Sequence, residues 1–460
     1  MFLRRNIMSK FLRSFSITLC LLLAVSMLAG CGKTTAGSGN NNSSGASASS
    51  GEPVQTEKKE KISIEWTVWG NPGENKKFED FTSDFNKKHE ADINLKYTPI
   101  PNDGYSQKLL SSLAAGTAPD VFYLGDDITT YIKENRLVDL APMMAASQTI
   151  QPDKFALNIF GAGKQGDKIW GIVPDCNPLV VYYNADMINS LGEKNPQQYL
   201  DEGNWNWDAF ASIAKKVAAT GMHGFVFSST WWGPQAFYLG QAGEGIVFNA
   251  EGTKVDLDNP DKTEGVKFMY ALSKEKAVTS TVQLPKGQDE ISLFISQQAA
   301  MMTLGRWAVP VLKDIKDFKW DIVPFPKTTS GKEVKSSVAI AYVAMNKDSK
   351  HSKEAFIFME EFLNKDGQIY RLKDGGNALP SLIDPELSSI AEDGIVGHGK
   401  YFSELRNNGL GVPIGGQLCP EAGTAVYDTL GQMYLGKIDA DTCIKQALEK
   451  GDAQLAKNSN

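Results

Sequence analysis

Aromatic and polar side chains gather where predicted strands of this sequence end. In an open parallel sheet, ligands bind beyond the carboxyl ends of the strands. Tryptophan, tyrosine, asparagine and aspartate at such positions can stack on a small molecule and hydrogen-bond to it. Asp126 and Asp127 have a second interpretation as solvated acids of a turn. The first set of candidates is Trp69, Asn71, Tyr123, Asp126 and Asp127.

Tryptophans also stand at two later strand ends. Trp231 and Trp232 are adjacent in a loop after the strand expected over 224–227, and two neighbouring rings cannot easily face one core. We therefore expect one of them to contact a ligand and the other to pack. Trp307 ends another short apolar strand and is a candidate for stacking, whereas Arg306 beside it is either a ligand contact or part of a surface ion pair.

The stretch 171–184 reads as two extended segments with a polar break between them. Leu179–Tyr183 is an unbroken apolar run, the pattern of a strand buried on both faces. Asp175 and Asn177 lie between two prolines, so we expect their backbone neither to continue a ladder nor to enter a helix. A polar kink of this kind is typical of a cleft floor or a domain crossing, although an ordinary strand-loop-strand has the same pattern.

The segments that carry these residues alternate between strand and helix. Apolar residues at every second position predict strands, and apolar residues at i, i+3 and i+7 predict helices. The alternation is typical of an open parallel sheet in an α/β fold. Strands are expected over 62–68, 93–97, 119–124, 179–183, 224–227, 299–304 and 337–345, and helices over 78–85, 105–115, 353–363, 424–435 and 441–450.

The segment Gly161–Gly166 matches the pattern GxGxxG. A dinucleotide site needs a helix that opens at the last glycine, because the helix N-terminus holds the pyrophosphate. Strand-like residues follow here instead, so we interpret the segment as a glycine-rich turn.

The composition is that of a folded protein with several domains. The 460 residues suffice for two or three domains, and 42% hydrophobic and 22% charged residues are normal for a globular chain. Residues 1–30 carry four basic side chains and no acidic one, so without them the net charge falls from -7 to -11. An acidic chain without a basic, aromatic-rich patch is not expected to bind nucleic acid.

The 5 cysteines show no spacing typical of a metal site. Cys176, Cys419 and Cys443 fall in the folded part of the chain. A Cys176–Cys419 bridge would require both residues to line one cleft, and separate thiols are favoured. We expect no metal and no cofactor.

The N-terminus has the features of a lipoprotein signal peptide over residues 1–30. A basic segment precedes an apolar run that is too short to span a membrane, and the run ends in Leu28–Cys31. This end resembles a bacterial lipobox, whose cysteine is lipidated; the alternative is an ordinary signal peptide that contains a cysteine. Residues 31–59 then read as a flexible linker with a reach of roughly 30 Å. We expect membrane attachment through lipidated Cys31 only.

Several short motifs occur in an order that resembles a known family. They are Ala115–Val121, Tyr182–Asp186, Trp207–Asp208, Ala299–Met301 with Gly305–Trp307, and Ala378–Pro380. Together with the Cys31 motif, they resemble family 1 extracellular solute-binding proteins, the maltose-binding-protein-like receptors of bacterial ABC importers. The resemblance covers nearly the whole mature chain.

The resemblance implies a two-lobed periplasmic-binding-protein-like α/β fold with three interdomain crossings and a helical C-terminus. Proline-bounded junctions near 175–181, 323–326 and 376–380 match the number of crossings. Asp175 and Asn177 would then face the cleft from the first crossing. Lobe 1 is expected over 60–178 and 326–377, and lobe 2 over 179–325 and 378–460.

The resemblance also implies a binding function. A carbohydrate, expected to be an oligosaccharide, would be captured between the lobes and delivered to the permease of an ABC transporter. The protein would be a monomer outside the cytoplasm, anchored to the cell membrane. The substrate-binding residues are expected among Trp69, Asn71, Tyr123, Asp126, Asp127, Asp175, Asn177, Trp231, Trp232, Arg306, Trp307, Asn377 and Gln417.

Two alternatives remain at this stage. Paired carboxylates and aromatic rings also suit a secreted carbohydrate-active enzyme. No nucleophile elbow, HExxH pair or P-loop is present, so we predict no catalytic residue. The other alternative is a receptor of the same fold for a peptide, polyamine or anion, and the aromatic content favours a neutral sugar.

Overall fold

The computed structural model describes residues 60–70, 72–156, 159–243, 245–374, 376–390 and 397–458. The predicted signal peptide, the linker with Cys31, and Asn71 lie outside these ranges. The chain divides into Met1–Lys58 and Lys59–Asn460, and the second unit contains all the described residues. No helix among the described residues is long and apolar enough to cross a membrane.

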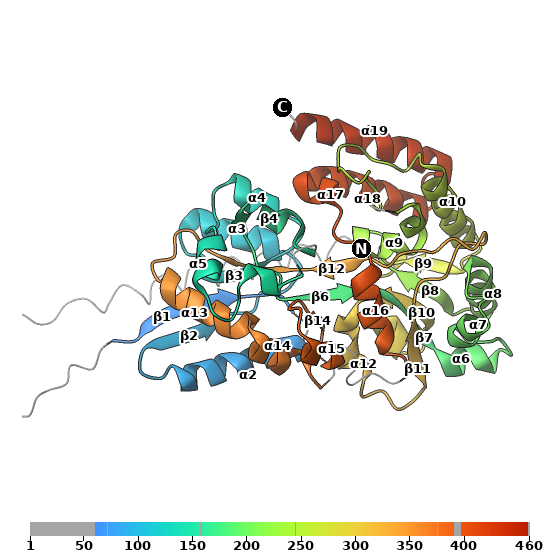
Figure 1. The fold of residues 1–460 in the computed structure, drawn as a ribbon. Helices are drawn as coiled ribbons and strands as arrows, with labels where there is room; N and C mark the ends of the chain where they lie inside the picture. Colours follow the sequence, from blue (N-terminus) through green and yellow to red (C-terminus); the bar gives the residue numbers. More distant parts are fainter. Residues whose placement is uncertain are drawn as a thin grey trace, which may run out of the picture. The chain divides into compact units, whose positions relative to one another are not determined.

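A four-stranded sheet organises the first lobe (Figure 1). Its strand order is β13 (Tyr342–Met345), β3 (Val121–Leu124), β1 (Ile62–Thr67) and β2 (Ile93–Tyr97). The inward faces of α2 (Pro72–Lys88), α3 (Tyr105–Ala115) and α13 (Ser352–Leu363) are buried, as their apolar spacing predicts. β1 pairs with β2 and β3 in parallel, whereas β13 runs antiparallel to β3.

A five-stranded sheet organises the second lobe. Its order is β11 (Trp320–Val323), β7 (Val180–Asn184), β10 (Ala299–Leu304), β8 (His223–Phe227) and β9 (Val278–Ser280). All residues of β7 are buried, which confirms the prediction for this apolar run. β7 is antiparallel to both of its neighbours, whereas β10, β8 and β9 are parallel, so this sheet is mixed. In each lobe, the strand that runs antiparallel to its neighbours is the first strand after the chain crosses from the other lobe. The crossing therefore sets the direction of that strand.

A three-stranded sheet lies between the two larger sheets (Figure 1). β6 (Asp175–Pro178) pairs antiparallel with β12 (Val338–Ile340) on one side and β14 (Leu379–Pro380) on the other. The expectation that 175–177 cannot join a ladder is therefore wrong. The two prolines only limit the strand to four residues. We call this sheet the hinge sheet, because β6 leads into β7 of the second lobe and β12 leads into β13 of the first.

The second crossing lies later in the chain than the sequence suggested. Phe325 packs in the core of the second lobe, and the Pro324 carbonyl accepts a hydrogen bond from the Trp205 indole at 2.9 Å. Residues 323–326 therefore belong to the second lobe, and we place the second crossing at β12. The first and third predicted crossings coincide with β6 and β14.

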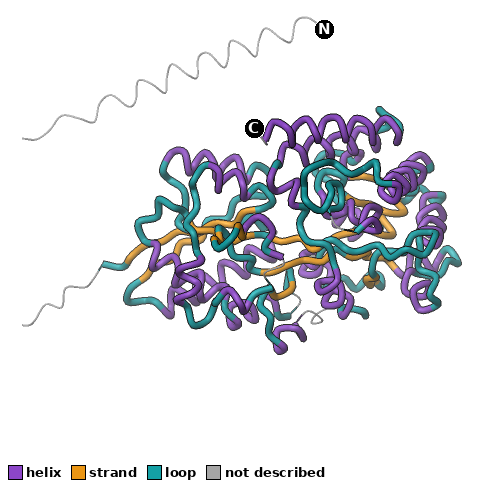
Figure 2. Tube along the Cα trace, turned by 45° about the horizontal axis from the view of Figure 1, so that its top comes forward, coloured by secondary structure: helices purple, strands orange, loops and turns teal. Residues whose placement is uncertain are grey.

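The C-terminal part of the chain is helical, as predicted (Figure 2). It contains α15 (Pro385–Ile390), α16 (Lys400–Asn408), α17 (Ile414–Leu418), α18 (Pro420–Tyr434) and α19 (Ala440–Asn458).

The segment 161–166 forms η3 (Gly161–Gly163) and β4 (Lys164–Gln165), so it is a turn, as interpreted. The remaining elements are α4 (Ile128–Lys133), α5 (Ala141–Ala146), η1 (Pro152–Lys154), β5 (Lys168–Ile169), α6 (Ala185–Ser190), α7 (Pro196–Asp201), α8 (Trp207–Ala218), α9 (Trp232–Leu239), η4 (Gly240–Ala242), α10 (Pro260–Lys274), η5 (Thr281–Gln283), α11 (Glu290–Ile295), η6 (Arg306–Ala308), α12 (Val309–Leu312) and α14 (Lys365–Leu372).

Candidate functional site

Trp69 lies half-buried just beyond β1, at the edge of the first lobe's core. Its ring meets the rings of Tyr105 and Tyr123 edge-on, with centroids 4.9 and 5.7 Å away. These contacts hold the indole from one side and leave part of it accessible. Asn71, the neighbouring candidate, lies outside the described residues.

Two buried polar atoms of the candidate residues have no hydrogen-bond partner among the described residues. They are the Tyr123 hydroxyl and Oδ1 of Asn177. A buried polar group that lacks a partner costs roughly 1–3 kcal/mol. Such atoms are therefore suited to accept or donate hydrogen bonds to a bound molecule.

The adjacent tryptophans Trp231 and Trp232 of the second lobe differ in burial. Trp232 is only 3% exposed and packs in the core, whereas Trp231 is half-buried. The Trp231 ring lies 6.2 Å from the ring of Trp307, which is also half-buried and packs against two large hydrophobic clusters. Trp231 and Trp307 thus form one aromatic surface from two strand ends.

Glycines make room for both rings of this surface. A Cβ added to Gly233 would lie 2.2 Å from the Trp231 ring. A Cβ added to Gly305 would lie 2.1 Å from the Trp307 ring. In each case the ring folds back over a glycine two residues away, so the glycine fixes the direction in which the ring points.

Asp126 connects the two lobes. Its Oδ2 accepts a hydrogen bond from Nε1 of Trp232 at 2.7 Å. Burial raises the pKa of Asp126 to about 6, the Trp232 N–H opposes this shift, and the charge of Asp127 adds to it. Asp127 precedes α4 as its N-cap but makes no side-chain capping bond. Both acids therefore lie at the end of β3 beside the tryptophans.

Asp175 does not present a free carboxylate. It is 8% exposed, and its Oδ2 accepts a hydrogen bond from Arg371 at 2.7 Å. Burial raises the pKa of Asp175, and the Arg371 charge opposes the rise. Arg371 also donates to the Pro174 carbonyl at 3.2 Å. We therefore revise the role of Asp175 from ligand contact to hinge support.

Arg306 is not a surface residue. It is 0% exposed, and its guanidinium donates to backbone carbonyls of Leu372, Gly376, Ala378 and Ile390. The interpretation as a surface ion pair is therefore wrong, because the side chain turns inward from the end of β10.

Asn377 lies between the carbonyls that Arg306 binds. Its Nδ2 donates to Oε1 of Glu74 in α2 at 2.6 Å. A cavity of about 110 Å³ adjoins this pair, between α2 and α12. The cavity is lined by Gly73, Glu74, Lys77, Phe78, Pro310, Lys313, Arg371, Gly376 and Asn377.

Gln417 is fully buried and bonded to the protein rather than to a ligand. Its Oε1 accepts from the Ala162 N–H at 2.8 Å, and its Nε2 donates to the Tyr342 hydroxyl at 2.8 Å. Gly161 leaves the space, because a Cβ there would lie 2.4 Å from Gln417 Oε1. The Gln417 side chain thus lies against the glycine-rich turn, which leaves room for it.

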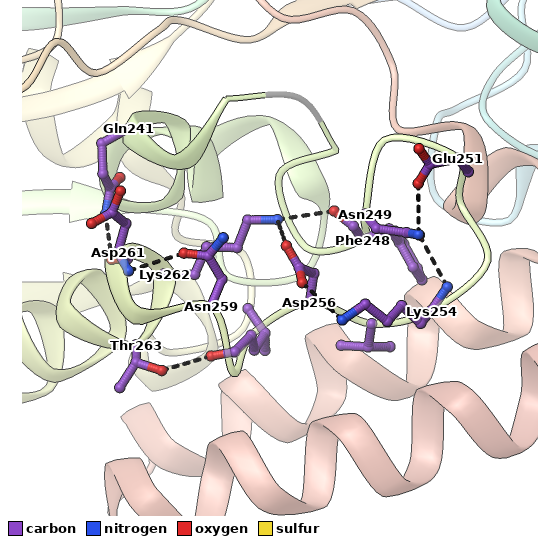
Figure 3. Close-up of polar contacts among 12 residues, drawn as sticks. Gln241, Phe248, Asn249, Glu251, Lys254, Asp256, Asn259, Asp261, Lys262 and Thr263 are labelled. Carbon is purple, nitrogen blue, oxygen red and sulfur yellow. Dashed lines mark hydrogen bonds and ion pairs between the residues drawn. The ribbon is translucent and has the colours of Figure 1, made fainter.

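Hydrogen bonds and an ion pair hold the loop between η4 and α10 together (Figure 3). Lys262 is buried and donates to the Phe248 carbonyl at 2.9 Å and to Asp256 at 3.1 Å. The Phe248 ring faces Gly415 of α17, where an added Cβ would lie 2.7 Å from the ring. Phe248 thus packs closely against the helix that carries Gln417.

The structure joins six of the thirteen candidates in two separate chains of contacts. One chain of contacts runs through Asp126, Trp232, Trp231 and Trp307, and another runs from Trp69 to Tyr123. The sequence analysis did not predict Glu74 and Arg371, because a lone acid in a first helical turn and a lone arginine in a helix carry no motif.

The described residues include no group of His, Cys, Asp or Glu able to hold a metal, and Cys176 and Cys419 are free buried thiols. The arrangement offers stacking surfaces and hydrogen bonds, which is the chemistry of binding.

Comparison with known proteins assigns the family. A family model described as bacterial extracellular solute-binding protein matches residues 80–389. The chain belongs to the bacterial extracellular solute-binding protein family. An uncharacterized lipoprotein of Streptomyces antibioticus is 24% identical over 322 residues, or 67% of this solute-binding protein and 68% of that one.

Solved structures share the two-lobed fold of this solute-binding protein. An ABC substrate-binding protein from Listeria monocytogenes, in complex with cycloalternan, aligns with a TM-score of 0.75 and 21% identity. It covers 86% of this chain and 100% of its own. The GacH receptor of Streptomyces glaucescens, studied with acarbose, aligns at 0.71 and 18% identity over 86% of this chain and 99% of its own.

The raised pKa of Asp126 predicts a pH-dependent stability. Folded Asp126 binds its proton more tightly than the unfolded chain does, so its contribution to stability falls as pH rises from about 4 to about 6. Above about pH 7 the contribution is constant. The free energy of unfolding in urea, measured as wild type minus Asp126→Asn, should decline over this interval and then level. A difference independent of pH would contradict the assignment.

The contact of Gly305 with Trp307 predicts a defined effect of one methyl group. Gly305→Ala should push the Trp307 ring away from Trp231, because the added Cβ has no room. Near-ultraviolet circular dichroism should lose the signal of the tryptophan pair while far-ultraviolet helicity stays. Gly411→Ala is the control, since a Cβ there meets nothing within 4 Å. An unchanged aromatic spectrum in Gly305→Ala would show that the rings are not coupled.

Proposed function

We propose that this protein is a lipid-anchored extracellular receptor that binds a carbohydrate between its lobes and delivers it to the permease of an ABC transporter. The ligand is proposed to be an oligosaccharide, and the receptor to act as a monomer. It performs no reaction on the ligand and needs no cofactor.

The observation that carries the proposal is the half-exposed pair of Trp231 and Trp307. Aromatic rings cover the C–H faces of a sugar, and each such contact contributes about 0.5–1.5 kcal/mol beyond area burial, by analogy with aromatic pairs. The Tyr123 hydroxyl and the Asn177 amide supply neutral hydrogen-bonding groups for sugar hydroxyls. Structures with the same fold were solved with cycloalternan and with acarbose, which supports this ligand class.

Ligand discrimination follows from the two lobes. A ligand that contacts Trp69 in the first lobe and Trp307 in the second stabilises the arrangement in which both are close. A few stacking contacts and hydrogen bonds reach a micromolar dissociation constant, or about -8 kcal/mol. The transporter would then distinguish the loaded receptor from the empty one.

The charges near the rings favour a neutral ligand over an anionic one. The buried charges of Asp175 and Arg371 neutralise each other, and the Arg306 guanidinium is directed to carbonyls. An anionic cargo would find no free positive charge in these two guanidiniums, whereas a sugar needs none.

Membrane attachment is proposed from the sequence. Cys31 ends a signal peptide with the lipobox pattern, and residues 31–59 give the folded part a reach of roughly 30 Å. A single lipid at this position would hold the receptor close to its permease. The Streptomyces antibioticus relative is named a lipoprotein, which agrees with this proposal.

Removing either exposed ring should weaken saccharide binding. We expect isothermal titration calorimetry with linear and cyclic maltooligosaccharides to identify a ligand. Trp307→Ala and Trp231→Ala should each raise its Kd about 2- to 13-fold, equivalent to one stacking contact. Tyr270→Ala is the control, because Tyr270 is also a half-buried aromatic residue but packs from α10 against the second lobe's core. Unchanged Kd values in both variants would place the site elsewhere, and turnover of the saccharide would contradict a receptor.

Lipidation should depend on one cysteine. Cys31→Ser should abolish incorporation of a palmitate label and release the protein from the membrane fraction, because no other group carries the lipid. Cys20→Ser, in the same N-terminal segment, should be labelled and retained like wild type. Continued labelling of Cys31→Ser would rule out the anchor.

A further inference from the structure

Arg306 has an unusual environment for a charged residue. It lies just after β10, where the second lobe supplies residues to the proposed binding site. It follows β10 directly, is 0% exposed, and precedes Trp307 in η6. A long charged side chain is rarely buried unless its polar atoms are satisfied. Its burial therefore calls for a role other than solvent contact.

The guanidinium binds carbonyls of two helices. The Leu372 carbonyl, at 3.3 Å, is the last of α14, and the Ile390 carbonyl, at 3.1 Å, belongs to α15. Carbonyls in the last turn of a helix lack intrahelical partners, and a cation there also meets the negative end of the helix dipole. Arg306 thus caps α14 and joins it to α15.

The same guanidinium holds the third crossing. Its Nη1 lies 2.8 Å from the Gly376 carbonyl and 3.1 Å from that of Ala378. These carbonyls flank Asn377, whose side chain extends the other way, to Glu74 of α2. The position of Asn377 is therefore set by Arg306 on its backbone side and by Glu74 on its side-chain side.

The strand end that carries Arg306 is itself fixed. The Tyr182 hydroxyl donates to the Gly305 carbonyl at 2.8 Å, from the buried strand β7. Trp307 packs against two large hydrophobic clusters, one of which contains residues of both β3 and β10. A shift of the third crossing is thus transmitted to the ring of Trp307 through one residue of backbone.

We propose that Arg306 is a positioning residue of the binding site, which fixes the third crossing against the end of β10 so that Trp307 and Asn377 form one preorganised wall. This inference rests on the proposed function for its effect on affinity. Its structural part, the coupling of the crossing to the strand end, stands independently of any ligand.

The coupling is tested on the ligand-free protein by amide hydrogen exchange. Arg306→Met should accelerate exchange about tenfold, or 1.4 kcal/mol, both in 376–380 and in 308–312, because the two segments lose their common support. Arg136→Met is the matched control: Arg136 pairs with Glu134 at 3.4 Å, outside both segments, and both segments should exchange as in wild type. Acceleration in only one segment, or in neither, would overturn the proposal.

The effect on affinity is tested with the saccharide identified by calorimetry. Arg306→Lys keeps the charge but cannot reach all four carbonyls, so it should raise the Kd about tenfold, in the range seen when residues that support a binding group are removed. Its unfolding midpoint should lie closer to wild type than that of Arg306→Met. Wild-type Kd in Arg306→Lys together with wild-type exchange in Arg306→Met would show that Arg306 only fills space. Failure of the wild type to bind any saccharide would instead contradict the proposed function, while the exchange result still decides the coupling.

Discussion

The pairing of Asp175 with Arg371 inside the hinge is the interaction on which the rest of the structure depends. β6 pairs with β12 on one side and with β14 on the other, and its first residue, Asp175, is only 8% exposed. Removing one partner of a buried ion pair costs about 3–5 kcal/mol, because the other charge is left without compensation. Arg371 comes from α14 of the first lobe and also binds the Pro174 carbonyl. The pair therefore ties the first crossing to the first lobe.

The charged residues near the lobe junction and the aromatic residues beside them have different roles. The strongest charges near the lobe junction point inward and support the backbone, as Arg371 and Arg306 do. The groups left half-exposed or unpartnered beside them are aromatic rings, a phenol and an amide, which suit a neutral molecule with apolar faces. The polarity of the site is thus low although charged residues are numerous around it.

The sequence predicted the elements well and the roles of individual polar residues less well. Periodicity located β1, β3, β7 and the C-terminal helices, because burial of one face or of both leaves a pattern in neighbouring residues. It could not show that Arg306 turns inward or that Gln417 enters the other lobe, since both outcomes depend on carbonyls and glycines far away in the chain. The second crossing was placed too early for a similar reason: a proline-bounded segment at 323–326 looks extended whether it crosses or packs. Family resemblance supplied the number of crossings and the two lobes.

The most direct measurement is a crystal structure of the protein grown with a bound oligosaccharide. The central claim is that rings from distant parts of the chain converge on one ligand between the lobes. It predicts a sugar ring stacked on Trp307 or Trp231, with a hydroxyl within hydrogen-bond distance of the Tyr123 hydroxyl or the Asn177 amide, and Arg306 still bound to its carbonyls. A sugar bound on the outer surface of one lobe, with these rings uncovered, would contradict it.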